Sequence, residues 1–242
     1  MGLEFAPVPL FGFIELAELQ QRWIERFPEL TELQAVPSSA DLAGGPQVQV
    51  FTGVPRLRVW AQGSDNGLLV QSQSDRLILN WRKQFSGGHT YPSYDVLRIE
   101  FERLWEEYSS FLGDRGFGQA VPSAAEYTYV NHIKLGPGED FEDVLAIWTV
   151  PDNPLPGTNE STQFQLIRSV QSEDDTFPAQ IVVIGGPQSV DGQRVLSLNI
   201  TSKVLFATGG APFDALDAAH ALSSHTFANI TTSTKHEEWD RE

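Results

Sequence analysis

The stretch LLVQSQSDRLILNWRK, Leu68 to Lys83, decides how this chain is expected to fold. It contains no glycine or proline, the residues that most often interrupt a strand. It therefore predicts one long strand, or two strands joined at Ser74–Asp75. The alternation places two sets of side chains on opposite faces: Asp75, Leu77, Leu79 and Trp81 on one, and Arg76, Ile78, Asn80 and Arg82 on the other.

Helical and strand-like segments surround this stretch in the first half of the chain. Glu15–Phe27 repeats apolar residues at helical spacing and is closed by Pro28. A longer helix with an apolar stripe is expected from Tyr94 to about Leu112. The rest of this half is expected to form a weak strand over 7–13, a loop over 35–46, and strands over 47–51 and 56–62.

The second half of the chain has a similar order of segments. A strand (125–135), a short acidic helix or turn (138–148) and three further strands (162–170, 179–186 and 194–206) precede a last helix from Phe213 to Ile230. We therefore expect an α+β fold of two similar halves, 1–120 and 121–242, each an antiparallel sheet (strand–helix–three strands–long helix) backed by helices. An internal duplication packed as one compact domain would explain this pattern.

Charge and composition limit the classes of partner. The formal charge is −16, with ten Lys/Arg against fifteen Asp/Glu in residues 1–120 and six against seventeen in residues 121–242. Such a surface repels nucleic acid and attracts a basic protein, although acidity can also serve solubility alone. Without cysteine there is no disulfide framework or thiol nucleophile. The absence of a long apolar run and of a basic leader predicts a cytoplasmic protein that does not enter a membrane.

Three of the five histidines, His220, His225 and His236, fall in the C-terminal segment. Asp217 and His220 are three residues apart and can share one face of a helix, but His220 lies within an apolar stripe. We interpret them as a structural pair. Helical metal sites usually place two histidines four residues apart, and the spacings here are five and eleven. No metal site is expected.

The segment YTYVNHI, Tyr127 to Ile133, reads as a strand. Alternation places Tyr127, Tyr129, Asn131 and Ile133 on one face, with His132 on the other. An acid–base pair of His132 with His220 or Asp217 is an alternative. A nucleophile elbow, a GxGxxG loop and a P-loop are all missing from the sequence, so neither a catalytic residue nor a cofactor is predicted.

Arg76, Asn80 and Arg82 place planar hydrogen-bond donors on one strand face of an otherwise acidic chain. The first interpretation is internal pairing with Asp or Glu across the sheet, which is usual for semi-buried arginine. The second is a site for an anionic ligand or partner, because arginine binds carboxylates and phosphates through two parallel hydrogen bonds.

Four motifs together resemble a sporadically distributed bacterial family of uncharacterised proteins. They are DRLILNWRK (Asp75–Lys83), YPSY (Tyr91–Tyr94), YTYVNHI (Tyr127–Ile133) and the C-terminal LDAAHALSSHTFANITTSTKHEEW (Leu216–Trp239). The patchy distribution of that family implies mobile or defence-related genes, and the family implies no reaction or cofactor. The candidate ligand- or partner-binding residues are Arg76, Asn80, Arg82, Tyr91, Tyr94, Asn131, His132, Asp217, His220, His236 and Trp239.

These observations favour a non-enzymatic, cytoplasmic protein-binding module, such as an antitoxin, an immunity protein or a phage-defence accessory protein. The expected partner is a basic protein encoded nearby, and a homodimer is an alternative. The competing hypothesis is a small-molecule or nucleotide-binding sensor or enzyme with its site between the two halves.

Overall fold

The structure is a computed structural model that describes residues 1–9, 11–35, 57–64, 67–83, 90–147, 163–170, 178–190, 192–206 and 210–239. The chain forms two compact units. Unit 1 comprises Met1–Ala125 and Phe206–Phe213, and unit 2 comprises Glu126–Leu205 and Asp214–Glu242. The expected strand at 47–51 and almost all of the loop at 35–46 lie outside the described residues. The boundary expected between residues 120 and 121 stays a prediction.

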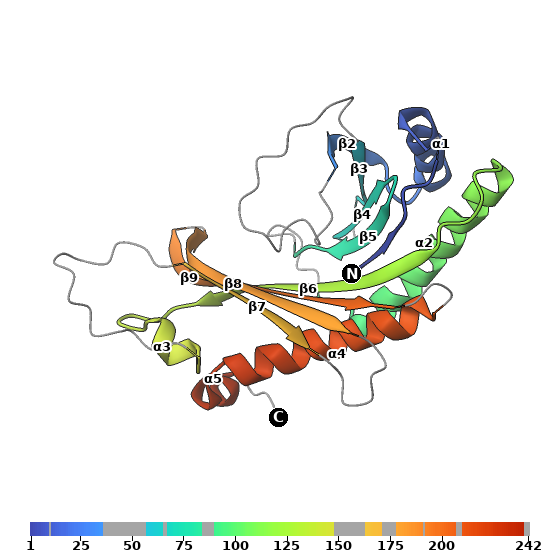
Figure 1. Ribbon diagram of the computed structural model, residues 1–242. Coiled ribbons are helices and arrows are strands. Elements are labelled where there is room, and N and C mark those ends of the chain that lie inside the picture. The colour runs from blue at the N-terminus through green and yellow to red at the C-terminus, as the bar shows by residue number, and fades with distance from the viewer. Residues whose placement is uncertain are drawn as a thin grey trace. The chain divides into compact units, whose positions relative to one another are not determined.

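Unit 1 combines antiparallel strands with two helices (Figure 1). Its elements are β1 (Gly2–Phe5), α1 (Phe13–Trp23), β2 (Glu29–Gln34), β3 (Leu57–Gln62), β4 (Leu68–Gln73), β5 (Arg76–Trp81) and α2 (Tyr94–Asp114). Of the two alternatives for Leu68–Lys83, the structure has the second, because β4 and β5 are separate strands that pair antiparallel on either side of Ser74–Asp75.

The core of unit 1 lies on one face of these strands. Leu77 and Leu79 of β5 are 0% and 2% exposed. Ser72, which lies opposite Leu77, accepts a hydrogen bond of 2.9 Å from Gln20 of α1. The helices therefore cover the Leu77 face of the sheet. Removing an apolar side chain of this size from water contributes about 1.5–3 kcal/mol to stability.

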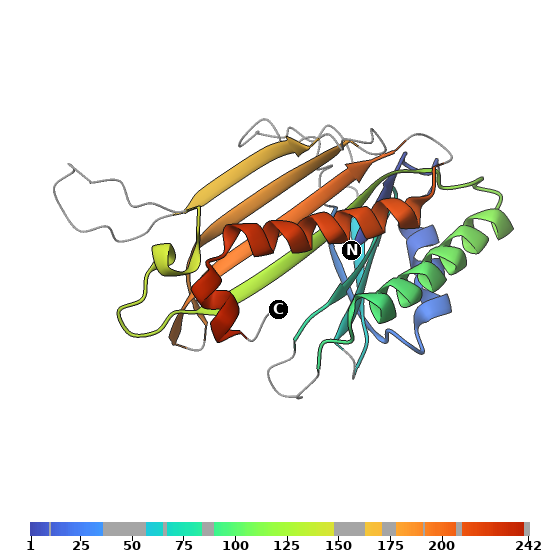
Figure 2. The same cartoon turned by 90° about the horizontal axis from the view of Figure 1, so that it is seen from below.

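The second part of the chain contributes four longer strands and three helices among its described residues. They are β6 (Pro122–Lys134), α3 (Phe141–Val144), β7 (Phe164–Val170), β8 (Ala179–Val190), β9 (Gln193–Leu205), α4 (Pro212–Ile230) and α5 (Ser233–Glu238). Figure 2 shows α4, the long orange-red helix, running across the strands of unit 2. The core beneath it includes Val183, Leu198 and Ile200.

The expectation of two separate antiparallel sheets, one in each half, is wrong. The strands belong to one nine-stranded sheet with the order β2-β3-β4-β5-β1-β6-β9-β8-β7. Sequence periodicity identifies strands but does not say which strands pair, and two sheets would expose four unpaired edges where one sheet exposes two. With helices and antiparallel strands both present, the α+β class fits the structure.

Some element assignments also differ from the expectation. The first strand is Gly2–Phe5 rather than 7–13, and all four of its residues are buried, so it shows no alternation. Glu29–Gln34 forms a strand that the sequence pattern did not predict, and its residues are mostly exposed. The short helix Ser233–Glu238 follows a segment rich in threonine, where the last helix was expected to have ended.

Candidate functional site

The face of the unit 1 sheet opposite its helices carries a group of polar and aromatic side chains. Strand alternation and the β3–β4–β5 register place Arg58 and Trp60 on this face together with Gln71 and Asn80. Gln62 and Arg82 belong to the same face. We call these six residues the arginine–tryptophan cluster: Arg58, Trp60, Gln62, Gln71, Asn80 and Arg82.

Arg76 has a structural partner at one side of this cluster. Its Nη2 lies 2.5 Å from Oε1 of Glu4, and the two side chains are 7% and 11% exposed. Since β1 and β5 are paired strands that place Glu4 opposite Arg76, the ion pair crosses the sheet between neighbours. Arg76 therefore neutralises a buried carboxylate, and its role is to hold β1 against β5.

The other two arginines of this face bind uncharged partners. Arg58 donates from Nη1 to Oε1 of Gln71 at 2.8 Å, and Trp60 donates from Nε1 to the same oxygen at 2.9 Å. Arg82 donates to Oε1 of Gln62. The guanidinium carbons of Arg58 and Arg82 lie 5.3 and 5.7 Å from the centroid of the Trp60 ring. Tryptophan attracts cations over its face, so Trp60 holds both guanidinium groups near one place.

Several donors of the cluster have no acceptor among the described residues. They are Nε of Arg58 and Nδ2 of Asn80, both of which are buried. Burial of the guanidinium lowers the pKa of Arg58, and the nearby charge of Arg76 lowers that pKa further. The cluster is therefore rich in positive charge and in hydrogen-bond donors, and poor in carboxylates.

In unit 2, the predicted alternation of β6 is confirmed. Tyr127 and Ile133 are buried and Tyr129 and Asn131 are half-buried, whereas His132 is exposed. His220 of α4 lies on the Tyr129 side, with Nε2 3.0 Å from the Tyr129 hydroxyl. Its ring also meets the Tyr127 ring edge-on at 4.9 Å. His132 projects from the opposite face of β6, so the alternative acid–base pair of His132 with His220 is wrong.

A second polar contact fixes α4 on the sheet. The hydroxyl of Ser223 lies 3.2 Å from the carbonyl oxygen of Tyr127 and 2.8 Å from Oγ of Ser202. Ser223 and Ser202 are both 0% exposed. The hydroxyl of Ser223 is the donor in both contacts and shares its one proton between them, so it links α4 to β6 and to β9. These contacts position the helix, and the pairing of Asp217 with His220 stays a prediction.

The C-terminal histidine and tryptophan also make packing contacts. Nε2 of His236 lies 2.7 Å from Oγ1 of Thr231, and the Trp239 ring stacks on Phe227 at 5.8 Å. Beside them, the side chain of Lys235 is 3% exposed, and its ammonium lies 2.6 Å from a carboxylate oxygen of Glu139 and 2.5 Å from one of Glu238. This ion pair holds α5 against the loop before α3, and no sequence pattern indicated it.

The pKa values of this ion pair follow from its contacts. A hydrogen bond from the Gly136 N–H, and then one from Lys235, lower the pKa of Glu139. Burial alone would lower the pKa of Lys235, but hydrogen bonds and charge from Glu139 and Glu238 outweigh burial and raise that pKa.

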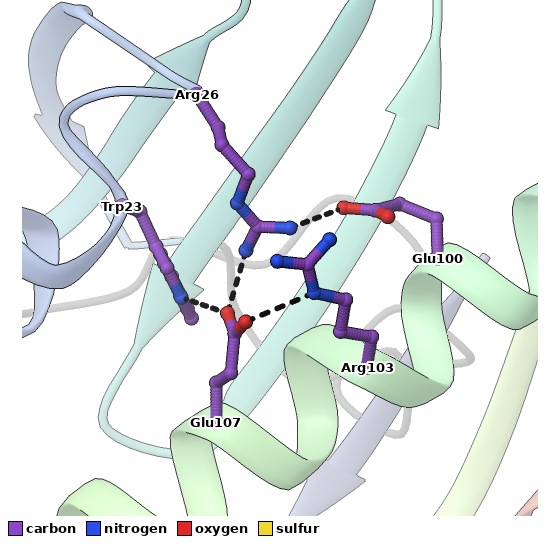
Figure 3. Close-up of polar contacts among 5 residues, drawn as sticks. All are labelled: Trp23, Arg26, Glu100, Arg103 and Glu107. Atoms are coloured by element: carbon purple, nitrogen blue, oxygen red, sulfur yellow. Dashed lines mark hydrogen bonds and ion pairs between the residues drawn. The ribbon is translucent and has the colours of Figure 1, made fainter.

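An ion-pair network that the sequence also did not reveal joins α1 to α2 in unit 1 (Figure 3). Glu107 accepts hydrogen bonds from Trp23 at 2.7 Å, Arg26 at 2.5 Å and Arg103 at 3.2 Å. Arg26 also reaches Glu100 at 2.7 Å. Every cation of this network is bound to a carboxylate, so these contacts hold α1 and the turn after it against α2.

The remaining predicted residues lie apart from these groups. Tyr91 is 42% exposed, and its ring meets Trp81 edge-on at 5.3 Å. Tyr94 is half-buried at the first position of α2. Nδ2 of Asn131 is buried on the α4 side of β6 and has no partner in the described part of the chain. The eleven predicted residues therefore do not form one site. Arg58 and Trp60 were not among them, although both lie on the same face of the predicted strand RLRVWAQ.

The face of the unit 2 strands opposite α4 carries exposed apolar side chains among polar ones. Val130, Ile167 and Ile184 are 62%, 43% and 45% exposed. The β7–β8 register places Ile167 beside Val182 and keeps Ile184 on the same face. Thr128 and Thr201 share a hydrogen bond of 3.0 Å on this face, and Asn199 lies opposite Ile184. We call this surface the open sheet face: Thr128, Val130, Ile167, Val182, Ile184, Asn199 and Thr201.

The described residues contain no group of three or more His, Cys, Asp or Glu side chains that could hold a metal ion. Within the same part of the chain, no helix is both long and apolar enough to cross a membrane. No protein-family model matches the sequence, and comparisons with curated proteins and with solved structures found no match.

Proposed function

We propose that this protein is a non-enzymatic, cytoplasmic protein-binding module that recognises a basic protein through the open sheet face. Such a module would act as an antitoxin, an immunity protein or a phage-defence accessory protein, in line with the family resemblance of its motifs. The observation that carries the proposal is the exposure of Val130, Ile167 and Ile184 together on one side of four paired strands.

An exposed apolar patch bordered by polar groups is typical of a protein-interaction surface. Here the apolar side chains come from β6, β7 and β8, and the threonine and asparagine side chains of the open sheet face lie among them. Thr128, Asn199 and Thr201 supply hydrogen-bonding groups without charge. These side chains resemble the centre of a protein interface, which is depleted of charged residues, and His132 projects from the same face of β6.

The charge of the chain indicates the kind of partner. Residues 121–242 hold seventeen Asp/Glu against six Lys/Arg. Opposite charge on the partner would accelerate the encounter, and the apolar contact would then retain the complex. A basic protein with an exposed apolar patch fits both features.

The experiment is co-expression of the chain with each protein encoded next to its gene, followed by size-exclusion chromatography with light scattering. We expect a complex with a basic neighbour that weakens between about 50 mM and 500 mM salt, because screening shortens the range of electrostatic attraction. Ile184→Glu should weaken binding at least about tenfold, which corresponds to about 1.4 kcal/mol.

The matched control is Ile99→Glu, which places the same charge at an isoleucine of α2 that is 66% exposed. It should leave the affinity unchanged. Equal affinity of the Ile184→Glu variant and the original chain would contradict the proposal. So would the absence of any protein complex together with turnover of a small molecule.

A further inference from the structure

The face of the unit 1 sheet opposite its helices carries positive charge that its described carboxylates do not balance. Three guanidinium groups lie there, and within the described part of the chain only that of Arg76 pairs with a carboxylate, that of Glu4. Arg58 and Arg82 bind the amide oxygens of Gln71 and Gln62 instead. In a chain with a formal charge of −16, two cations whose partners among the described residues are all neutral are a specific local feature.

One more carboxylate lies on this face by register. Glu29 of β2 is opposite Gln62, and it is exposed. Within the described residues it forms no ion pair with Arg58 or Arg82, which contact Gln71, Gln62 and Trp60 instead. Semi-buried arginine is normally paired with an anion, so a ligand is a physical reason for this arrangement.

The hydrogen-bonding capacity of the cluster points to an acceptor. Nε of Arg58 and Nδ2 of Asn80 are buried donors without a partner in the described part of the chain. Buried donors are nearly always satisfied in folded proteins. The two guanidinium carbons lie 5.3 and 5.7 Å from the same ring centroid, that of Trp60, so both can serve one ligand.

We propose that the arginine–tryptophan cluster binds a phosphate-bearing small molecule, such as a nucleotide, through Arg58, Asn80 and Arg82. A phosphate monoester carries a charge near −2 at neutral pH and three acceptor oxygens, which matches two guanidinium groups and the amide donor. This site lies wholly within unit 1 and does not depend on the open sheet face of unit 2.

Isothermal titration calorimetry of the full chain with AMP and with inorganic phosphate tests this inference, with adenosine and succinate as comparison ligands. We expect AMP and phosphate to bind and adenosine not to bind. Arg58→Gln and Arg82→Gln should each weaken AMP binding at least about tenfold, because hydrogen bonds to charged groups are strong.

The matched control is Arg22→Gln, which removes an exposed arginine of the same unit that pairs with Asp114. It should bind AMP as the original chain does. Arg82 is exposed, so its variant is expected to fold, and thermal melting checks this for every variant. Absence of binding to both AMP and phosphate, unchanged affinity in the Arg58 and Arg82 variants, or tighter binding of succinate than of phosphate would each overturn the inference.

Discussion

Replacing Arg76 with methionine should destabilise the protein strongly. The guanidinium of Arg76 lies 2.5 Å from the carboxylate of Glu4, and the side chains are 7% and 11% exposed. Methionine keeps most of the aliphatic volume but leaves the carboxylate of Glu4 buried without this cation. Breaking a buried ion pair from one side typically costs about 3–5 kcal/mol. For a protein of this size, such a loss lowers the melting temperature by about 6–20 °C.

Chemical denaturation followed by circular dichroism measures this loss. Arg22→Met is the control, because the side chains of Arg22 and Asp114 are 40% and 58% exposed and such a pair contributes at most about 1 kcal/mol. Adding Glu4→Leu to Arg76→Met should recover most of the lost stability, since the buried charge is then gone. A loss below about 1 kcal/mol for Arg76→Met alone would refute the assignment of Arg76 as a structural residue.

Three further changes test the packing and the electrostatics of the two units. Tyr108→Phe removes a buried hydroxyl that has no partner among the described residues, so the free energy of unfolding should stay the same or rise by about 1 kcal/mol. A decrease of about 1 kcal/mol, measured by urea titration, would contradict this expectation. Ser223→Ala should lower the free energy of unfolding by about 1–3 kcal/mol in the same assay, because the hydrogen bond from Ser223 to the carbonyl oxygen of Tyr127 in the sheet is lost. An unchanged free energy of unfolding would argue against that hydrogen bond. Hydrogen bonds from Gly136 and Lys235 lower the pKa of Glu139, so the stability that this carboxylate contributes should be present above about pH 4.3 and be lost as the pH falls through the lower folded pKa. Glu139→Gln should therefore make the free energy of unfolding less dependent on pH in this acid range. An unchanged pH dependence in the variant would contradict this role of Glu139.

The faces of individual strands could be predicted from the sequence. Alternation in YTYVNHI placed Tyr129 and Asn131 on one side and His132 on the other, and the burial of β6 follows that order. The same reasoning put Leu77 and Leu79 on one face of β5 and Arg82 on the other, and both leucines are buried. These predictions succeed because side chains of a strand alternate regardless of which strands lie beside it.

The pairing of elements that are distant in the chain could not be predicted from the sequence. Nothing in the residues of β1 or β6 indicates that these strands are neighbours in one sheet. The partner of Lys235, Glu139, is almost a hundred positions away, and a lone lysine after a threonine-rich segment gives no signal of burial. Long-range contacts depend on the assembled fold, whereas sequence patterns report mainly on local structure.

The candidate sites show the same limit. The arginine patch was recognised in β5, but it combined Arg76, which binds Glu4, with Arg82, which lies over Trp60. Arg58 and Trp60 belong to a different strand, and only the β3–β4–β5 register brings them to the same face. The open sheet face was missed because its apolar residues are spread over three strands, and each alone reads as an ordinary strand residue.

Site-specific photo-crosslinking in cells tests most directly whether the open sheet face recognises a partner. A photoreactive amino acid is placed at Ile184 in one variant and at Ile99, which is also an exposed isoleucine, in the other. We expect irradiation of the Ile184 variant to produce an adduct with one basic protein, and the Ile99 variant to produce none. Adducts from the Ile99 position alone, or equal adducts from both positions, would contradict recognition through this face.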